Sequence, residues 1–344
     1  MRGSVMKAAV IGCGNISKTH LPILEGLEGV EISSVVDVNR ERADFAAKKY
    51  GCAAFYDFEE MLQESRPDCV HICTPHYLHT KMAVRALETG VNVLCEKPCA
   101  ISKDEIEKLK AAASKSTALF GVCFQNRFNP CVEKARELVE SGRLGRLVGE
   151  SGRVSWFRNR EYYSDDWHGK KALEGGGVLV NQAVHTADLL RYLSLSEVKS
   201  VQAHVFNDTL KGVIEVEDSA FVRYELENGA IAVLSATNAF ALNADVAIEL
   251  YFDSGEKLLI EGANLYHLKR GGELSLLVGQ TDEKVCGKSY WGNGHAALIK
   301  EFYRCIREKE PFSIDAFEGS KASVEFLAAY ESAKSGKSVS IKNF

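Results

Sequence analysis

The chain has 344 residues, of which 46% are hydrophobic and 26% charged, with 28 glycines and 6 prolines. These values are ordinary for a globular protein and exclude disordered, collagen-like and low-complexity chains. The net charge of −5 and the lack of a basic stripe argue against nucleic acid as a partner.

Neither targeting signals nor paired cysteines stand out. Met1–Met6 lack the apolar region of a signal peptide, and no stretch reaches the ~18 apolar residues of a membrane span. None of the ten cysteines forms a Cys-x-x-Cys pair, which indicates a reduced chain. We therefore expect a soluble cytoplasmic protein with no membrane partner.

From Lys7 to about Gln125, short apolar runs alternate with amphipathic stretches. This is the pattern of βαβ units, and the apolar runs are typical of a parallel sheet covered on both faces. The expected strands are 8–11, 32–36, 69–73, 92–95 and 118–122. One expected helix ends at Leu27, and the other helices span 40–50, 80–89 and 103–114. The sequence predicts an α/β Rossmann domain, a doubly wound parallel sheet, over residues 1–125.

After Gln125 the alternation stops. Strand patterns cover 147–157, 198–206, 219–226, 230–237, 247–252 and 257–260, the last two forming a hairpin, and helices are expected over 130–141, 296–308 and 317–335. Residues 126–344 are therefore predicted to form an α+β domain with a large, mostly antiparallel sheet, which binds substrate and mediates oligomers.

A glycine turn follows the first predicted strand. Gly12, Gly14, Asn15 and Ile16 open the next helix, where backbone amides can approach a pyrophosphate, and Ser17 replaces the third glycine of the usual motif. We expect these residues to bind a dinucleotide. The alternative is that the glycines only form a tight turn.

Asp37 ends the second predicted strand. Its carboxylate can accept hydrogen bonds from an adenosine ribose and would repel a 2′-phosphate, which favours NAD over NADP. Arg40 is a further candidate for the cofactor site. Because of Arg40 and Asn39, NADP is left as an alternative cofactor. The alternative role for Asp37 is to cap the next helix.

Four segments together resemble the Gfo/Idh/MocA oxidoreductase family. They are the glycine turn, residues 73–79 (CTPHYLH), residues 95–98 (CEKP) and the stretch from the glycines at 175–177 to Asn181 and His185. The most specific element is Glu96-Lys97-Pro98. The resemblance implies a nicotinamide-dependent dehydrogenase that acts on a secondary hydroxyl of a sugar, a polyol or a sugar derivative, including nucleotide-linked sugars.

The resemblance also implies a cofactor site at the ends of the parallel strands. Ligands bind open α/β sheets at this edge. The residues assigned to the ribose and nicotinamide side are Thr74, Pro75, His79, Glu96, Lys97 and Gln125. His71 lies in an apolar run and is expected to be a packed core residue, and the place of His76 is left open.

Alcohol oxidation needs one group to take the hydroxyl proton and another to stabilise the developing charge on oxygen. A histidine titrates near neutral pH, and a lysine can hydrogen-bond the reacting oxygen. We assign His185 as the general acid/base and Lys97 as the electrostatic group, and a cis bond before Pro98 is an option. A solvated Lys97 is the alternative.

Asn181 and His185 are four residues apart and are predicted to share one helical face, followed by Asp188. Many family members carry Asp at the position of Asn181, and an amide cannot take that proton, so Asn181 is expected to orient substrate. The alternative is that His185 only pairs with Asp188. These two residues are too few for a metal site and no Cys/His cluster has zinc spacing, so no metal is expected.

Residues 157–167 resemble the family's substrate-binding loop. Arg158 and Arg160 could pair with a carboxylate, as on a uronic acid, and Tyr162 and Trp167 offer faces to a sugar. The expected substrate contacts are Lys97, Arg158, Arg160, Tyr162, Trp167, Asn181 and His185.

Two other functions belong to the same resemblance. One is an NAD-dependent glycosidase, and the other is a non-catalytic regulator that binds the dinucleotide, against which the retention of Lys97 and His185 argues. The exposed sheet face of the second domain predicts a homodimer or homotetramer.

Overall fold

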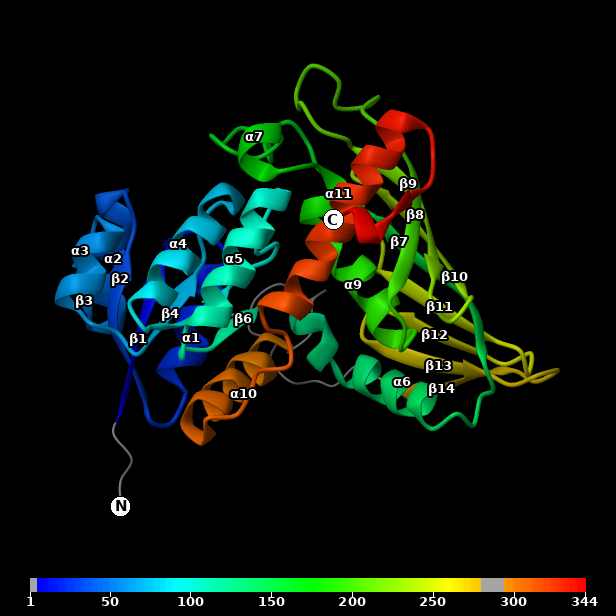
Figure 1. The fold of residues 1–344 in the computed structure, drawn as a ribbon, viewed down its shortest axis with the longest axis horizontal. Coiled ribbons are helices and arrows are strands. Elements are labelled where there is room, and N and C mark those ends of the chain that lie inside the picture. Colours follow the sequence, from blue (N-terminus) through cyan, green and yellow to red (C-terminus); the bar gives the residue numbers. More distant parts are fainter. Residues whose placement is uncertain (1–4, 280–293) are drawn as a thin grey trace. The chain divides into compact units, whose positions relative to one another are not determined.

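The computed structural model describes residues 5–279 and 294–344, which Figure 1 draws in colour. Their contacts divide them into two units: residues 5–125 with His295–Ser320, and residues 126–279 with Gly294 and Lys321–Phe344. None of the described helices is both long and apolar enough to cross a bilayer. All nine cysteines in these ranges are free thiols, and Cys286 lies outside them.

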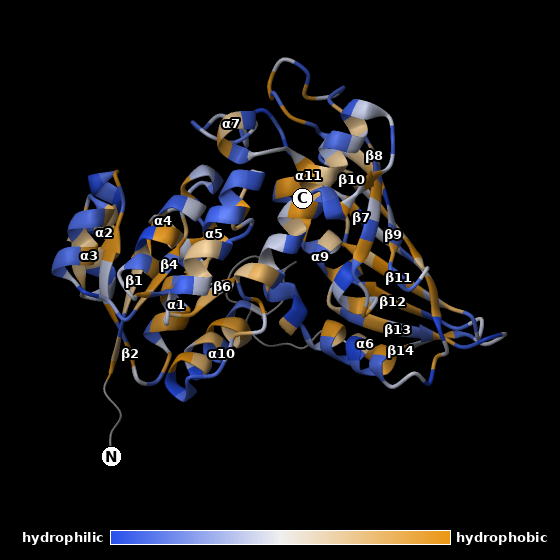
Figure 2. Cartoon of the chain, viewed as in Figure 1, coloured by the Kyte–Doolittle hydropathy of each residue, from blue (hydrophilic) through white to orange (hydrophobic). Residues whose placement is uncertain are grey.

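The first unit is built on a six-stranded parallel sheet in the order β3-β2-β1-β4-β5-β6, as the sequence predicts for a Rossmann domain. Its strands are β1 Met6–Ile11, β2 Val30–Val36, β3 Ala53–Phe55, β4 Cys69–Ile72, β5 Asn92–Cys95 and β6 Phe120–Val122. Figure 2 shows strands of this sheet mainly in hydrophobic colours and helices such as α4 in both colours. This contrast fits a buried sheet covered by amphipathic helices.

Three of the five helices between these strands begin at a side-chain cap. The five helices are α1 Ser17–Glu25, α2 Arg40–Tyr50, α3 Phe58–Glu64, α4 His76–Glu88 and α5 Lys103–Lys115. Asn39, Asp57 and Ser102 each accept a hydrogen bond from a backbone amide in the first turn of the helix that follows. Asn39 therefore caps α2, and Asp37 does not.

The segment after the second large sheet returns to the first unit, which the division into residues 1–125 and 126–344 did not anticipate. It contains α10 Gly294–Glu308. The amide of Val122 in β6 donates to the carbonyl of Ile314 at 3.0 Å. A Cβ on Gly121 would lie 2.9 Å from Phe302 and 2.8 Å from Phe312. Because glycine has no side chain, both rings can pack directly on the strand. Such long-range packing leaves no local pattern in the sequence.

The second unit contains a nine-stranded sheet in the order β14-β13-β12-β11-β7-β10-β9-β8-β15. Its strands are β7 Leu147–Ser155, β8 Val198–Phe206, β9 Ser219–Leu226, β10 Ile231–Thr237, β11 Ala247–Phe252, β12 Lys257–Glu261, β13 Asn264–Leu268, β14 Leu274–Val278 and β15 Val339–Ser340. All neighbours pair antiparallel except β7 and β10, which confirms the predicted mostly antiparallel sheet and its β11–β12 hairpin.

One face of this sheet carries the core of the unit. The helices are α6 Pro130–Glu140, α7 Lys171–Glu174, α8 Val178–Asn181, α9 Val184–Leu193 and α11 Ala316–Ser335. In Figure 1, α6 and α9 lie against the sheet, where apolar residues of α9 such as Leu190 pack on alternate strand residues such as Val222 and Leu234. Successive side chains of a strand point to opposite faces of the sheet, so every second residue of these strands reaches this core.

Asn181 and His185 do not share one continuous helix, so that expectation is wrong. The amide of Ala183 donates to the carbonyl of Val178, five residues back, at 2.8 Å. This wide turn ends α8 at Asn181 and lets α9 start at Val184.

Candidate active site

The turn between β1 and α1 has the geometry of a dinucleotide-binding turn. Gly12 has φ +91°, and a Cβ there would lie 2.6 Å from the carbonyl oxygen of Cys73. A Cβ on Gly14 would meet nothing within 4 Å, which leaves open space before α1. The backbone amides of Asn15 and Ile16 donate to no other residue in the described part of the chain. Free amides beside open space at a helix N-terminus fit a pyrophosphate.

Asp37 follows β2 and is held against this turn. One carboxylate oxygen accepts from the Cys13 amide at 2.8 Å, and the other accepts from the Asn39 amide at 2.8 Å. Each oxygen keeps a lone pair for a ribose hydroxyl. The guanidinium of Arg40 lies 4.1 Å from the ring centroid of Tyr56. These residues fit the adenosine half of NAD.

His79 joins the two turns that follow β4 and β5. Its ring nitrogens lie 2.7 Å from the carbonyl oxygen of Thr74 and 2.8 Å from that of Pro98. Pro75 is the residue before α4, and the hydroxyl of Thr74 contacts the Met82 sulfur at 3.7 Å. The structure therefore shows His79 bracing backbone, a role that the sequence did not indicate.

Gln125 lies at the end of the first unit and is fully buried. Neither its amide nitrogen nor its amide oxygen hydrogen-bonds to another described residue. A buried amide in this state is costly unless a ligand or water satisfies it. This observation fits its assignment to the cofactor site.

Glu96 and Lys97 follow β5, and both are buried. A Glu96 carboxylate oxygen lies 3.0 Å from Nε2 of His20 and 3.7 Å from Nε2 of His295. Burial raises the pKa of Glu96, but the hydrogen bond with His20 and the adjacent His295 ring outweigh it and hold that pKa well below its usual range. The Lys97–Pro98 bond is cis, as the sequence allowed.

These three side chains also satisfy the geometry of a metal site, because their ligand atoms all lie within 4.8 Å of one another. The sequence gave no sign of this cluster, since His20, Glu96 and His295 are far apart along the chain. His295 is the second residue of α10.

His185 is in the first turn of α9 and is buried. It lines a cavity of about 40 Å³ within the second unit, together with Asn126, Asn129, Trp156 and Gln182. The imidazole, the two asparagines and the glutamine offer hydrogen bonds to a hydroxyl group, and Leu189, Ile248 and Ile260 line much of the rest of this small cavity. His185 is the residue that the sequence predicted as the general acid/base.

Asn181 belongs to a polar network beside this cavity. Its amide nitrogen donates to Glu174 at 2.6 Å and to the hydroxyl of Tyr162 at 3.2 Å. The amide nitrogen of Gln182 donates to the same hydroxyl at 3.2 Å, and its oxygen accepts from Asn238 at 2.9 Å. The amide of Asn181 is therefore oriented with its nitrogen toward Glu174.

Glu217 fixes the start of α8, and sequence reasoning missed it. Its carboxylate accepts from the amides of Gly177 and Leu179, both at 3.0 Å, and from the hydroxyl of Tyr330 at 2.9 Å. A Cβ on Gly177 would lie 1.9 Å from the carbonyl oxygen of Glu217, and one on Gly176 would lie 1.9 Å from the Tyr330 hydroxyl. The glycines are required by this packing.

Asp188 pairs with arginines. Its carboxylate accepts from Arg127 at 2.5 and 2.7 Å and from Arg191 at 3.0 Å. The structure therefore shows Arg127 and Arg191, rather than His185, as the main partners of Asp188.

Residues 157–167, which the resemblance assigned to substrate binding, are held by contacts within the loop and with its surroundings. Arg158 donates to the Phe157 carbonyl and to Asn243 at 3.0 Å, and its guanidinium lies between the rings of Trp156 and Tyr162. Trp167 stacks on His168 with ring centroids 3.8 Å apart. The side chain of Arg160 is exposed and makes no ion pair with the described residues.

Residues 6–124 match the oxidoreductase family with an NAD-binding Rossmann fold, and residues 132–256 match the C-terminal domain of the same group. The chain belongs to the Gfo/Idh/MocA oxidoreductase family. The family resemblance, the fold class and NAD as cofactor are thereby confirmed.

Individual members of this Gfo/Idh/MocA family are similar over the whole chain. The D-glucoside 3-dehydrogenase of Escherichia coli is 29% identical, with 99% of both chains covered. The WlbA dehydrogenase of Bordetella pertussis, solved with NADH and UDP-GlcNAcA, is 26% identical with a TM-score of 0.84 over 97% of this chain and 98% of its own. Levoglucosan dehydrogenase, solved with NADH and levoglucosan, is 22% identical with a TM-score of 0.88 over 98% and 99%.

Proposed function

We propose that this protein is an NAD-dependent dehydrogenase that moves a hydride between nicotinamide and a secondary hydroxyl of a sugar or sugar derivative. The observation that carries the proposal is the buried His185 at a small cavity in the second unit, which Asn126, Asn129 and Gln182 also line. Family relatives named for the oxidation of glucosides and inositols support the substrate class.

His185 takes the hydroxyl proton in this proposal, and the Lys97 ammonium stabilises the charge that develops on the substrate oxygen. NAD, when bound, accepts the hydride. The amide of Asn181 cannot take the proton and orients the substrate. In the direction of alcohol oxidation, kcat/KM should rise as His185 loses its proton and fall as Lys97 loses its proton.

The test is a panel of glycosides, inositols and nucleotide sugars, followed by NADH absorbance. His185→Asn and Lys97→Met should each lower kcat by about 10²- to 10⁴-fold while NADH binding persists. His267→Asn, which removes a histidine paired with Glu256 in the same unit, should leave kcat unchanged. Release of an aglycone without net NADH would favour the glycosidase instead.

We further propose NAD over NADP, on the position of Asp37 against the glycine turn. Asp37→Ala should lower the ratio of kcat/KM for NAD to that for NADP. An unchanged ratio would remove Asp37 as the selecting residue.

A homodimer or homotetramer is proposed through the sheet face opposite the helices. This face carries exposed Phe221 and Val233 around a depression of about 580 Å³ that only strand residues line. Glu249 and Arg153 lie at the same depression, so two copies could present opposite charges to one another. Sedimentation should give the mass of two or four chains. Phe221→Glu should lower that mass, and Phe45→Glu, a change at an exposed phenylalanine of α2, should not.

A further inference from the structure

Three side chains that can each bind a metal ion meet inside the first unit. His20 belongs to α1, Glu96 follows β5, and His295 is in the first turn of α10. They are 0%, 5% and 4% exposed, respectively. Their ligand atoms all lie within 4.8 Å of one another, and in the described part of the chain no other set of three or more His, Cys, Asp or Glu residues comes so close together. Three separate stretches of the chain thus bring one ligand each to the same place.

The distances within this set match those between the ligands of one small ion. Oε1 of Glu96 lies 3.0 Å from Nε2 of His20 and 3.7 Å from Nε2 of His295. Neighbouring ligands of a tetrahedral zinc ion, bonded at about 2.0–2.2 Å, are about 3.3–3.6 Å apart. A hydrogen bond explains the first distance, but the second is longer than a hydrogen bond. Two nitrogens that face one carboxylate oxygen are the arrangement that a shared ion requires.

The ring of His20 is held in place from its other side. Its Nδ1 lies 2.8 Å from Nδ1 of His71, and Nε2 of His71 lies 3.1 Å from the hydroxyl of Tyr303. These contacts keep Nε2 of His20 toward Glu96, whichever nitrogens carry the protons. The ring of His295 is tilted by 67° from that of His20, with the centroids 5.9 Å apart. A metal-binding histidine is usually oriented in this way through its second nitrogen.

We propose that His20, Glu96 and His295 bind one zinc ion. Imidazole nitrogens suit zinc, whereas Mg²⁺ and Ca²⁺ prefer oxygen ligands. The ion has a structural role, because it joins the returning segment at α10 to α1 and to the end of β5, and it takes no part in hydride transfer. The expectation of no metal came from local spacing, which cannot show ligands that are far apart along the chain.

Two features of the surroundings decide how the site must be tested. The charge of Lys97 acts on His295 and therefore disfavours a second cation nearby, so that binding itself has to be measured. The nine cysteines of the described residues are free thiols, which are also zinc ligands. A zinc ion found in the protein must therefore be shown to have nitrogen and oxygen ligands.

The first test needs no variant. Protein produced in zinc-supplemented medium, with no added histidines, should keep one zinc ion per chain through gel filtration, as counted by elemental analysis. Zinc X-ray absorption should show ligands at about 2.0–2.1 Å and the outer scattering of two imidazole rings, without sulfur at about 2.3 Å. Less than stoichiometric zinc, or zinc bound by sulfur, would overturn the proposal.

The second test removes one ligand. His295→Leu should weaken zinc binding more than about 100-fold, because even changes to residues behind the ligands cost 10- to 100-fold. A chelator should lower the melting temperature of the native protein and leave that of His295→Leu unchanged. His267→Asn, at a histidine paired with Glu256 in the second unit, is the control and should keep one zinc ion.

Equal zinc contents for the native protein and His295→Leu would refute the site. If His295→Leu does not fold, the X-ray absorption spectrum of the native protein decides alone, because the ligand types are read from it directly. All of these measurements are made without NAD or substrate, so the zinc site and the proposed dehydrogenase activity can fail independently.

Discussion

Arg127 donates two hydrogen bonds to Asp188, from Nε at 2.7 Å and from a terminal nitrogen at 2.5 Å. Arg191 adds a third at 3.0 Å and lies 2.9 Å from Glu325. All four side chains are buried, and Asp188 is on α9 one turn after His185. The helix that carries the proposed acid/base residue is thus tied to its unit by a buried ion network.

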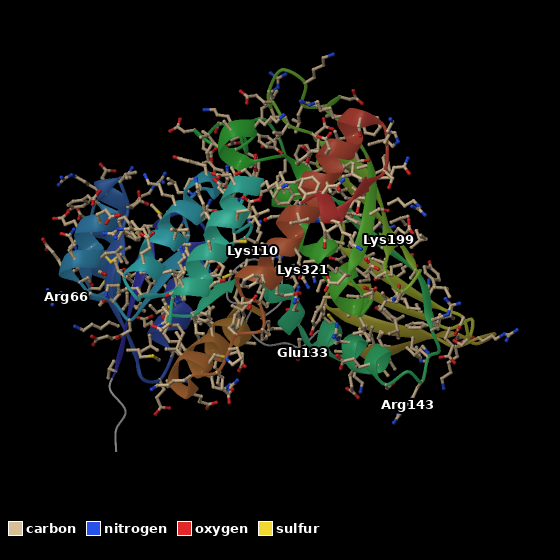
Figure 3. All side chains as sticks on the ribbon, in the orientation of Figure 1. Arg66, Lys110, Glu133, Arg143, Lys199 and Lys321 are labelled. Atoms are coloured by element: carbon tan, nitrogen blue, oxygen red, sulfur yellow. The ribbon has the colours of Figure 1, made fainter. Side chains whose placement is uncertain are left out.

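Asp188→Asn should lower the free energy of unfolding by about 3–5 kcal/mol, because two buried guanidinium groups lose their shared counter-charge. Urea unfolding measures it. Glu225→Gln is the matched control, because Glu225 pairs at the surface with Lys199, which Figure 3 labels. A loss for Asp188→Asn no larger than for Glu225→Gln would contradict the role of the network.

Gly177→Ala should disturb the start of α8, because its Cβ would lie 1.9 Å from the Glu217 carbonyl oxygen. We expect a loss of about 1–3 kcal/mol in unfolding free energy and a fall in kcat. Thermal melting and steady-state kinetics measure these. Gly149→Ala, whose Cβ would make an ordinary contact at 3.5 Å, should change neither.

Gly14→Ala should leave the fold intact, because its Cβ meets nothing within 4 Å. The methyl would occupy the open space where the pyrophosphate is expected. NADH binding should weaken about tenfold, equivalent to about 1.4 kcal/mol, as measured by calorimetry. Gly26→Ala, at the other end of α1, is the control, and equal affinities for the two variants would argue against this site.

Glu150 should make stability depend on pH. It lies in β7, its carboxylate hydrogen-bonds to no described residue, and burial raises its pKa well above the usual range. As pH rises above 4.5 the unfolded chain releases this proton while the folded protein retains it, so folding is progressively disfavoured. Glu150→Gln should therefore be more stable than the native protein at pH 8, and the difference should vanish near pH 4.

Glu249→Gln should change the pH dependence of stability in the opposite direction. Burial raises the pKa of Glu249, but hydrogen bonds from Lys257 and Ser151 outweigh it and lower that pKa below its usual range. The variant should be less stable than the native protein at pH 7, and the difference should shrink as pH falls below 4.5. Parallel pH profiles for the two variants would show that burial of Glu150 is not the cause.

The sequence predicted most clearly what local patterns encode. Gly12, Gly14 and Asp37 were found because a strand, a tight turn and a strand end each leave a signal within a few residues. The alternating strands of the second unit and the β11–β12 hairpin were predicted for the same reason. The parallel sheet of the first unit was predicted from the alternation of strands and helices, although the short strand β3 was not.

Features that depend on distant partners were not predicted. The residues next to Glu217 in the sequence do not distinguish it from a surface acid, because its partners Gly177, Leu179 and Tyr330 lie far along the chain. The wide turn at Ala183 breaks a stretch that looks like one helix, because helical periodicity continues through it. The partners of His20 could not be predicted from the sequence, because Glu96 and His71 are far from it along the chain and only the folded sheet brings them close.

The contact between Asn181 and Glu174 constrains how this protein could have diverged from its relatives. Replacing the amide with an aspartate would set two carboxyl groups at the 2.6 Å contact, where one must stay protonated. An ancestor or descendant bearing aspartate here would therefore need a compensating change at position 174. The two positions should be inherited as a pair, and swapping either alone should cost more than swapping both.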